Sequence, residues 1–382
     1  MDTSALASQG DRAAAAGDLD EAKRFLLQAI EASPNDPVLF LKLAGLQRAS
    51  GQVVEALEAV QRALAIEPRD FAGLLMQASL LEKLGRPGAA QAWSHALAQR
   101  PDGDIPSHLA AVVAHAERRV EEWTSERDAV MAKATAPAES RANPDEIEKI
   151  RRFRSNRLRR TKPYHSEPTD FHFPGVRERE FHPRSLFPWI EEVEAATEAI
   201  TSELRAVMAA ERAELVPYVQ YEDHLPMDQW RPLNRSLDWT AIHLLQSGQP
   251  VEANASHCPQ TMALLKRLPQ PQIPNAAPNA MFSLLAPRTE IPPHVGVNNA
   301  RLVCHLPLIV PEGCWFRVGA ETRYWKPGEA FVFDDTIEHA AVNPSDELRV
   351  VLIFDVWHPD LSEVEREAVA ALVATERGAG GL

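Results

Sequence analysis

The sequence predicts an α+β multidomain chain, with α-helical repeats in front and an all-β barrel or jelly roll behind. Three observations predict this fold class. Landmark residues recur 34 positions apart in the first hundred residues; the chain becomes rich in proline and aromatic residues after about residue 163; and short apolar runs separated by turn residues begin near residue 278. A chain of 382 residues is long enough for two or three such domains.

Glycine, alanine and proline recur in register in the N-terminal part. The landmarks are Gly17, Gly51 and Gly85, then Ala22, Ala56 and Ala90, then Ala29, Ala63 and Ala96, then Pro34, Pro68 and Pro101, with the third copy one residue short. A glycine suits the turn between two helices, alanines let helices approach closely, and a proline ends the second helix. This helix–turn–helix period resembles the tetratricopeptide repeat, and we expect a repeat domain over residues 1–125.

Stacked repeats bury a shared core, because one repeat alone cannot bury its apolar face. Two uses of such a stack remain open at this point. It could form a concave groove that holds a peptide or protein, or it could serve as a scaffold that caps the following domain.

A helical, basic linker is expected over residues 126–165, and eight Lys or Arg residues fall within 149–162. This cluster could attract an acidic partner or RNA, but a charge run is more often a solvated helix face or one that pairs with acidic neighbours. The net charge of −14 argues against general nucleic-acid binding.

The N-terminus lacks the basic start and apolar stretch of a signal peptide, and no run of about 18 apolar residues predicts a membrane span. Cys258, Cys304 and Cys314 show no metal-binding spacing and cannot all pair with one another. We therefore expect a cytoplasmic protein without membrane contact.

The C-terminal half begins with extended loops and one strong amphipathic helix over residues 190–211. The β-like runs that follow, such as "ARLVCHLPLIVP" and "LRVVLIFDVW", have the spacing of a barrel or jelly roll. His294 falls in a loop between two of the expected strands, and His339 follows the expected strand "AFVF". Arg349 opens the last long strand, where a buried guanidinium could bind a carboxylate through two hydrogen bonds.

Three segments carry a specific resemblance over about residues 170 to 358. They are "FSLLAPRTEIPPHVGVNNARLVCHLPLIVPEGCWFRVG", "WKPGEAFVFDDTIEHAAVN" and "LRVVLIFDVWHP". In this order they are similar to the aspartyl/asparaginyl β-hydroxylase family of iron(II)- and 2-oxoglutarate-dependent oxygenases. The resemblance implies a double-stranded β-helix oxygenase domain with flanking helices over residues 166–382.

The resemblance also implies roles for particular residues. His294 and His339 would bind iron(II), with Gly296 where related oxygenases have a carboxylate. Ser283 and Arg349 would hold the distal carboxylate of 2-oxoglutarate, and His305 would lie near its other end. Arg301 would face the substrate, although a structural ion pair is the alternative. Val303 departs from the family, whose better-known members have an arginine there. Asp334 and Asp335 could steady the His339 imidazole or simply form a turn.

The implied reaction uses iron(II), 2-oxoglutarate and O2 to hydroxylate the β-carbon of Asp or Asn residues in a peptide or protein. Two alternatives remain. One is a hydroxylase of a natural-product peptide or a small amino-acid-like substrate. The other is a repeat-based binding protein whose oxygenase half is inactive.

Overall fold

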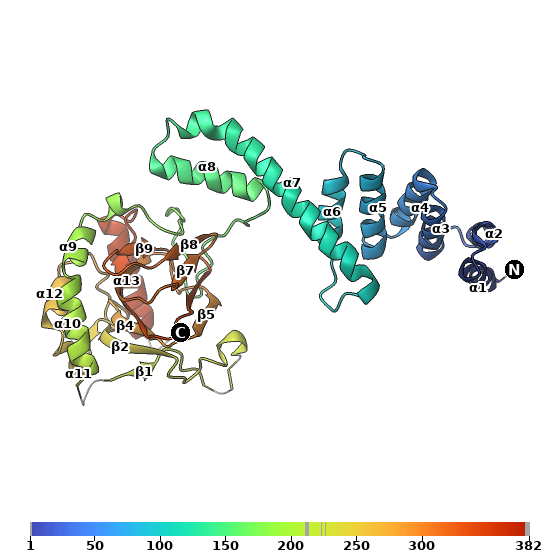
Figure 1. Cartoon of the computed structure of the whole chain (residues 1–382). Helices are drawn as coiled ribbons and strands as arrows, with labels where there is room; N and C mark the ends of the chain where they lie inside the picture. The colour runs from blue at the N-terminus through green and yellow to red at the C-terminus, as the bar shows by residue number, and fades with distance from the viewer. Residues whose placement is uncertain (1, 211–213, 223, 226, 379–382) are drawn as a thin grey trace. The chain divides into compact units, whose positions relative to one another are not determined.

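The computed structural model describes residues 2–210, 214–222, 224–225 and 227–378 and divides the chain into two compact units, 1–158 and 159–382 (Figure 1). The first unit is helical and the second is built around two β-sheets with helices beside them. Helical repeats followed by a β-rich domain are the predicted fold class.

Antiparallel helix pairs make up most of the first unit. Its helices are α1 (Thr3–Ala15), α2 (Leu19–Ala32), α3 (Pro37–Ala49), α4 (Val53–Ile66), α5 (Phe71–Lys83), α6 (Ala89–Leu97), α7 (Ser107–Glu139) and α8 (Pro144–Arg157). Aspartates cap four of them, since the side chains of Asp2, Asp18, Asp36 and Asp70 accept backbone N–H groups at the starts of α1, α2, α3 and α5.

The landmark glycines lie in the turns inside the helix pairs. Gly17, Gly51 and Gly85 have φ values of +84°, +78° and +60°, in the left-handed region that side chains with a Cβ disfavour. No atom lies within 4 Å of where their Cβ would stand, so backbone conformation rather than crowding selects glycine here.

The basic cluster lies mostly on α8 and pairs with acidic side chains. Arg154 binds Asp128 and Glu139 of α7, at 2.7 and 3.1 Å, and Arg151 also binds Glu139. The interpretation of the cluster as a face that pairs with acidic neighbours is therefore confirmed for these arginines. The helix before it is longer than expected, because α7 continues through Pro137 to Glu139. A proline so near the end of a helix removes little hydrogen bonding from it.

The second unit contains the remaining elements. Its helical elements are η1 (Arg184–Leu186), α9 (Ile190–Ala195), α10 (Thr197–Met208), η2 (Asp228–Trp230), α11 (Glu252–Ala255), α12 (Pro259–Leu265) and α13 (Glu363–Gly378). Its strands are β1 (Val216–Pro217), β2 (Trp239–Gln246), β3 (Gln249–Pro250), β4 (Ala280–Leu285), β5 (Thr289–His294), β6 (Arg301–Ile309), β7 (Trp315–Val318), β8 (Glu321–Tyr324), β9 (Phe331–Phe333), β10 (His339–Asn343) and β11 (Arg349–Trp357).

Two antiparallel sheets share the eight strands from β4 to β11. One sheet has the order β1-β2-β4-β11-β6-β9, with β3 beside β2, and the other has the order β5-β10-β7-β8. Counted from β4, the strands run 1-8-3-6 in the first sheet and 2-7-4-5 in the second, which is the order of a double-stranded β-helix. The space between the two sheets holds an aromatic-rich core that includes Phe316 and Phe333.

Helices α9, α10 and α12 pack on the other face of the larger sheet, where Ile200 and Leu204 join one core with Phe282 and Leu352. The expectation of one helix over 190–211 is wrong in part. The chain forms α9 and α10 with a turn at Ala196, and residues 211–213 lie outside the described residues. The Thr197 hydroxyl donates to the Glu194 carbonyl at 2.6 Å, a local bond that competes with regular helix.

No helix among the described residues is long and apolar enough to cross a bilayer.

Two buried histidines stand edge to face beside the larger sheet. The ring centroids of His182 and His358 are 5.1 Å apart, and both residues are at most 5% exposed. Burial lowers the pKa of His182 to about 3, with His358 and Arg179 adding to the shift, and burial also lowers the pKa of His358. Both imidazoles are therefore neutral at pH 7.

Acid should destabilise the second unit through these histidines. Between pH 6.5 and 3 the unfolded chain binds a proton that folded His182 does not, so the free energy of unfolding falls as pH falls through this window. Each such histidine contributes up to about 1.4 kcal/mol per pH unit. Urea unfolding followed by tryptophan fluorescence at several pH values measures this slope. We expect His182→Phe to reduce the slope by about one proton, and an unchanged slope contradicts the assignment.

Candidate metal and carboxylate site

Two imidazoles meet at one end of the smaller sheet. His294 is the last residue of β5 and His339 is the first of β10, and the antiparallel register pairs these two residues directly. Their ring centroids are 4.0 Å apart. Burial lowers the pKa of His294 to about 3 and that of His339 to about 4, so both rings are neutral and able to donate a lone pair at physiological pH.

The backbone fixes both rings in the same way. Nδ1 of His294 lies 2.8 Å from the carbonyl oxygen of Pro292, and Nδ1 of His339 lies 3.1 Å from that of Ile337. A carbonyl can only accept, so Nδ1 carries the proton in each ring and Nε2 is left to bind a metal. Two neutral imidazoles in contact fit iron(II). Within the described ranges, no three His, Cys, Asp or Glu side chains gather as a metal-binding group.

Gly296 has no room for a side chain. A Cβ on this residue would lie 2.1 Å from Oδ2 of Asp335, and the Gly296 N–H already donates to the Asp335 backbone oxygen at 2.6 Å. The carboxylate of Asp335 thus fills the space that an aspartate or glutamate at position 296 would need. The absence of a carboxylate from the His-x-Gly motif is therefore a packing requirement of this chain.

A buried arginine and a serine form a polar end of the cavity. Arg349 is 2% exposed, and its Nη1 donates to the carbonyl and the hydroxyl of Ser283 at 3.1 and 3.3 Å. Trp239 Nε1 also donates to the Ser283 hydroxyl, at 3.1 Å, and the Trp325 ring lies 4.8 Å from the guanidinium carbon. We call Arg349 and Ser283 the arginine end of the cavity.

No acidic side chain among the described residues forms an ion pair with Arg349. Burial lowers its pKa to about 9, and its Nε has no hydrogen-bond partner. A buried guanidinium of this kind costs stability until an anion binds, so the arginine end has the chemistry to bind a carboxylate.

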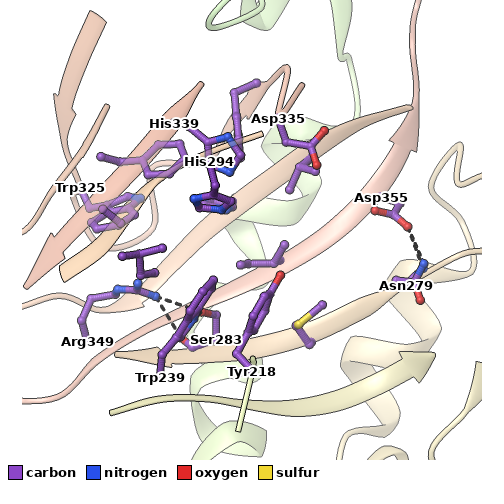
Figure 2. Close-up of a pocket in the computed structure, with 18 of the residues that line it drawn as sticks. Tyr218, Trp239, Asn279, Ser283, His294, Trp325, Asp335, His339, Arg349 and Asp355 are labelled. Carbon is purple, nitrogen blue, oxygen red and sulfur yellow. Dashed lines mark hydrogen bonds between the residues drawn. The ribbon is translucent and has the colours of Figure 1, made fainter. Parts of the chain in front are cut away.

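Figure 2 shows the two histidines between the arginine end and a second group of polar residues. Both ends belong to one cavity of about 200 Å³, lined also by Met281, Ile291, Phe316, Phe333 and Ile353. His305 lies in its wall with its ring against Phe333, at 4.8 Å between centroids, and its Nδ1 is buried without a partner. Burial lowers the pKa of His305 well below its usual value.

Arg301 lines the cavity from β6, but two aspartates engage its guanidinium. Nη2 lies 3.0 Å from Oδ2 of Asp335, and Nη1 lies 3.5 Å from Oδ1 of Asp355. Burial disfavours the charge, but the two carboxylates outweigh burial and raise the pKa of Arg301. Val303, on the same strand, adds an apolar side chain to the cavity wall.

The structure brings all six predicted site residues into this one cavity: Ser283, His294, Arg301, His305, His339 and Arg349. Sequence reasoning gave Trp239 no place in the site, whereas this core residue also lines the cavity and its indole donates to Ser283. It also missed Tyr218, Asn279 and Asp355. A signal existed for Asp355, because a lone carboxylate inside the apolar run "VVLIFDVW" needs a partner.

Comparison with known proteins identifies the two units. Residues 194–359 match the family model described as aspartyl/asparaginyl beta-hydroxylase, and residues 13–80 match the tetratricopeptide repeat model. Residues 194–359, somewhat less than half of the chain, are thus similar to the aspartyl/asparaginyl β-hydroxylase family. We refer to the second unit as the hydroxylase domain and to the first as the repeat domain.

Curated relatives match the hydroxylase domain over part of their own length. Human aspartate beta-hydroxylase domain-containing protein 2 is 38% identical over 37% of this chain and 39% of that protein. Mouse aspartyl/asparaginyl beta-hydroxylase is 35% identical over 39% of this chain and 20% of that protein. A Rhizobium tropici protein named ornithine lipid ester-linked acyl 2-hydroxylase is 34% identical over 46% of this chain and 59% of that protein. The chain thus spans about two-fifths or less of the length of the first two.

Solved structures match the repeat domain. The Arabidopsis OM64 TPR domain is 19% identical, with a TM-score of 0.28, over 31% of this chain and 94% of that one. The Sgt2 TPR domain from Aspergillus fumigatus is 21% identical, with a TM-score of 0.29, over 32% of this chain and 82% of that one.

Substituting Gly296 tests the packing requirement in the hydroxylase domain. Gly296→Ala should lower the free energy of unfolding by about 1–3 kcal/mol, because the new Cβ overlaps the Asp335 carboxylate. Urea midpoints with and without Asp335→Ala complete the comparison. We expect Gly296→Ala to cost less when residue 335 is alanine, and an equal cost in both backgrounds would contradict the packing argument.

Proposed function

We propose that this protein is an iron(II)- and 2-oxoglutarate-dependent dioxygenase that hydroxylates the β-carbon of Asp or Asn residues in a peptide or protein. One observation carries the proposal. A pair of neutral imidazoles and a buried guanidinium without an acidic partner share one cavity, which suits a metal and a carboxylate-bearing cosubstrate together.

The residues divide into three tasks. His294 and His339 would hold iron through Nε2, and Arg349 with Ser283 would bind the distal carboxylate of 2-oxoglutarate. His305 would lie near the other end of the cosubstrate. Bound iron would supply the activation of O2, so that one oxygen atom enters a substrate C–H bond and the other oxidises 2-oxoglutarate to succinate and CO2.

Trp239 and Trp325, which lie beside the arginine end, would orient the cosubstrate rather than react with it. Trp239 donates to the Ser283 hydroxyl, so this hydroxyl can still donate its own proton to a carboxylate. Trp325 covers the guanidinium and keeps water from it. Val303 offers no hydrogen bond, so in this chain the keto-acid end of 2-oxoglutarate would depend on the metal and His305.

The repeat domain supports a peptide or protein as the substrate or partner, since tetratricopeptide repeats commonly present a concave binding surface. We further propose a cytoplasmic location, because the three cysteines are free and buried.

A second candidate function is hydroxylation of an acyl chain, the activity in the name of the Rhizobium tropici relative. The observation that favours it lies on the segment that carries Tyr218. Large apolar side chains are exposed there, with Tyr218 at 39%, Tyr221 at 42%, Leu225 at 42% and Leu237 at 70%. Such side chains could hold a lipid chain or an apolar peptide segment beside the cavity.

Spectroscopy tests whether the site is a working oxygenase centre. Full-length protein with iron(II) and 2-oxoglutarate under argon should show a weak visible charge-transfer band, and admission of air with a peptide pool should give succinate and products heavier by one oxygen atom. His339→Ala should abolish the band and the turnover, whereas His257→Ala, an exposed histidine outside the cavity, should change neither. Absence of the band from the wild-type protein would favour the inactive oxygenase half.

Removing the buried guanidinium tests the cosubstrate role. Arg349→Met should raise the KM for 2-oxoglutarate about 10- to 100-fold, since charge-assisted hydrogen bonds contribute about 1.5–3 kcal/mol. Arg288→Met is the matched control, because Arg288 is exposed and binds Asp346 at the surface. An unchanged KM for 2-oxoglutarate in Arg349→Met would contradict the proposed role of Arg349 in binding this cosubstrate.

A further inference from the structure

The last strand carries both polar ends of the cavity. Arg349 and Asp355 lie on β11 with Ile353 between them, and all three line the cavity. Six residues of strand separate the ends by about 20 Å along the backbone. The histidine pair lies between them (Figure 2). The two ends can therefore hold two different molecules on either side of a bound metal.

The second end, which we call the acidic end, consists of Arg301, Asp335 and Asp355. It has two carboxylates for one guanidinium, and both carboxylates face that guanidinium at 3.0 and 3.5 Å. Asn279 donates its backbone and side-chain N–H groups to Oδ2 of Asp355, at 3.0 and 3.1 Å. Burial raises the pKa of the Asp355 carboxyl, and Arg301 and these hydrogen bonds oppose that shift. The arginine end is thus positive and the acidic end is negative.

Two polar atoms of the acidic end are buried without hydrogen bonds. One is an acceptor, Oδ1 of Asp335, and the other is a donor, Nη1 of Arg301. The Asp335 residue is 8% exposed. Buried polar atoms in native proteins normally have hydrogen-bond partners. Nη1 of Arg301 has an ion-pair contact with Asp355 at 3.5 Å but no hydrogen bond among the described residues, and Oδ1 of Asp335 has none either, so the two atoms point to a ligand that supplies both a donor and an acceptor.

We propose that the acidic end selects a primary carboxamide over a carboxylate, and therefore that the substrate side chain is asparagine-like rather than aspartate-like. This inference rests on the proposed function. A carboxamide has an N–H for Oδ1 of Asp335 and an oxygen for Nη1 of Arg301. A carboxylate satisfies the guanidinium but sets an oxygen lone pair against Asp335, in an environment that already has an excess of negative charge.

The acidic end also has room for the rest of a substrate. A second hollow of about 100 Å³ shares Asn279, Arg301 and Asp355 with the main cavity. Its other walls combine apolar residues, such as Ile273, Trp357 and Val373, with the polar residues Asp170, Asn298 and Arg377. A ligand bound at the acidic end can therefore extend away from the histidine pair.

Binding of two matched probes tests the preference without turnover. The probes are N-acetyl-L-asparagine N-methylamide and N-acetyl-L-aspartate N-methylamide, measured by saturation-transfer NMR on the full-length protein with zinc(II) and 2-oxoglutarate. We expect the asparagine probe to bind about tenfold more tightly or better, in line with the cost of an unpaired buried group. Equal affinity, tighter binding of the aspartate probe, or failure of both probes to saturate overturns the proposal.

Variants test whether the acidic end causes the preference. Asp355→Asn removes one negative charge with little change of shape, so the ratio of the two affinities should fall several-fold toward unity. Asp346→Asn is the matched control, because Asp346 pairs with Arg288 at the surface, and it should keep the wild-type ratio. An unchanged ratio in Asp355→Asn overturns the assignment to this end. If Asp355→Asn does not fold, the wild-type ratio alone decides.

The two proposals fail separately. A protein that shows the iron and 2-oxoglutarate band and forms succinate but has no amide preference keeps its proposed function and loses this inference. A protein that prefers the amide probe but shows neither band nor turnover keeps the binding assignment and loses the oxygenase.

Discussion

The site depends on the pairing of β5 with β10 in the smaller sheet. In an antiparallel pair, directly opposed residues are close neighbours, and this register opposes His294 and His339. A slip of one residue would turn one imidazole to the other face of the sheet. Each ring is then held by the carbonyl two residues before it in the chain, and aromatic side chains such as Trp230 and Phe333 pack against the pair.

Strand β11 supplies the second constraint, because it carries charge at both ends of a largely apolar run. Asp355 is balanced within the fold by Arg301 and Asn279, whereas Arg349 has only Ser283 and the face of Trp325. An anion that binds only the folded state would relieve this cost and stabilise the domain. The fold therefore neutralises the charge of Asp355 internally, whereas the charge of Arg349 has no acidic partner among the described residues.

Much of the fold could be predicted from the sequence because local rules determine it. The turn glycines Gly17, Gly51 and Gly85 show the helix pairs, since only a backbone with positive φ needs glycine there. The strands follow from apolar runs, and the two candidate metal-binding histidines follow from motifs. The break at Ala196 was missed because no glycine, proline or other turn residue marks it in the sequence.

Contacts between distant segments could not be predicted in this way. Asp335 fills the space beside Gly296 only because the loop after β9 returns to the end of β5. Trp239 reaches Ser283 from β2, and Arg301 meets Asp355 across the pairing of β6 with β11. Each depends on register between strands tens of residues apart. The aspartate partners of Arg301 could therefore not be predicted from the sequence, although an ion pair was one of its two expected roles.

X-ray absorption spectroscopy of the iron-loaded protein tests the central claim, a metal held by two imidazoles and no protein carboxylate. The account predicts scattering from two imidazole rings in the wild-type protein and from one ring in His339→Ala, with no change at the iron in Asp346→Asn. Scattering from one imidazole or none in the wild-type protein, or from a protein carboxylate bound to the iron, would contradict it.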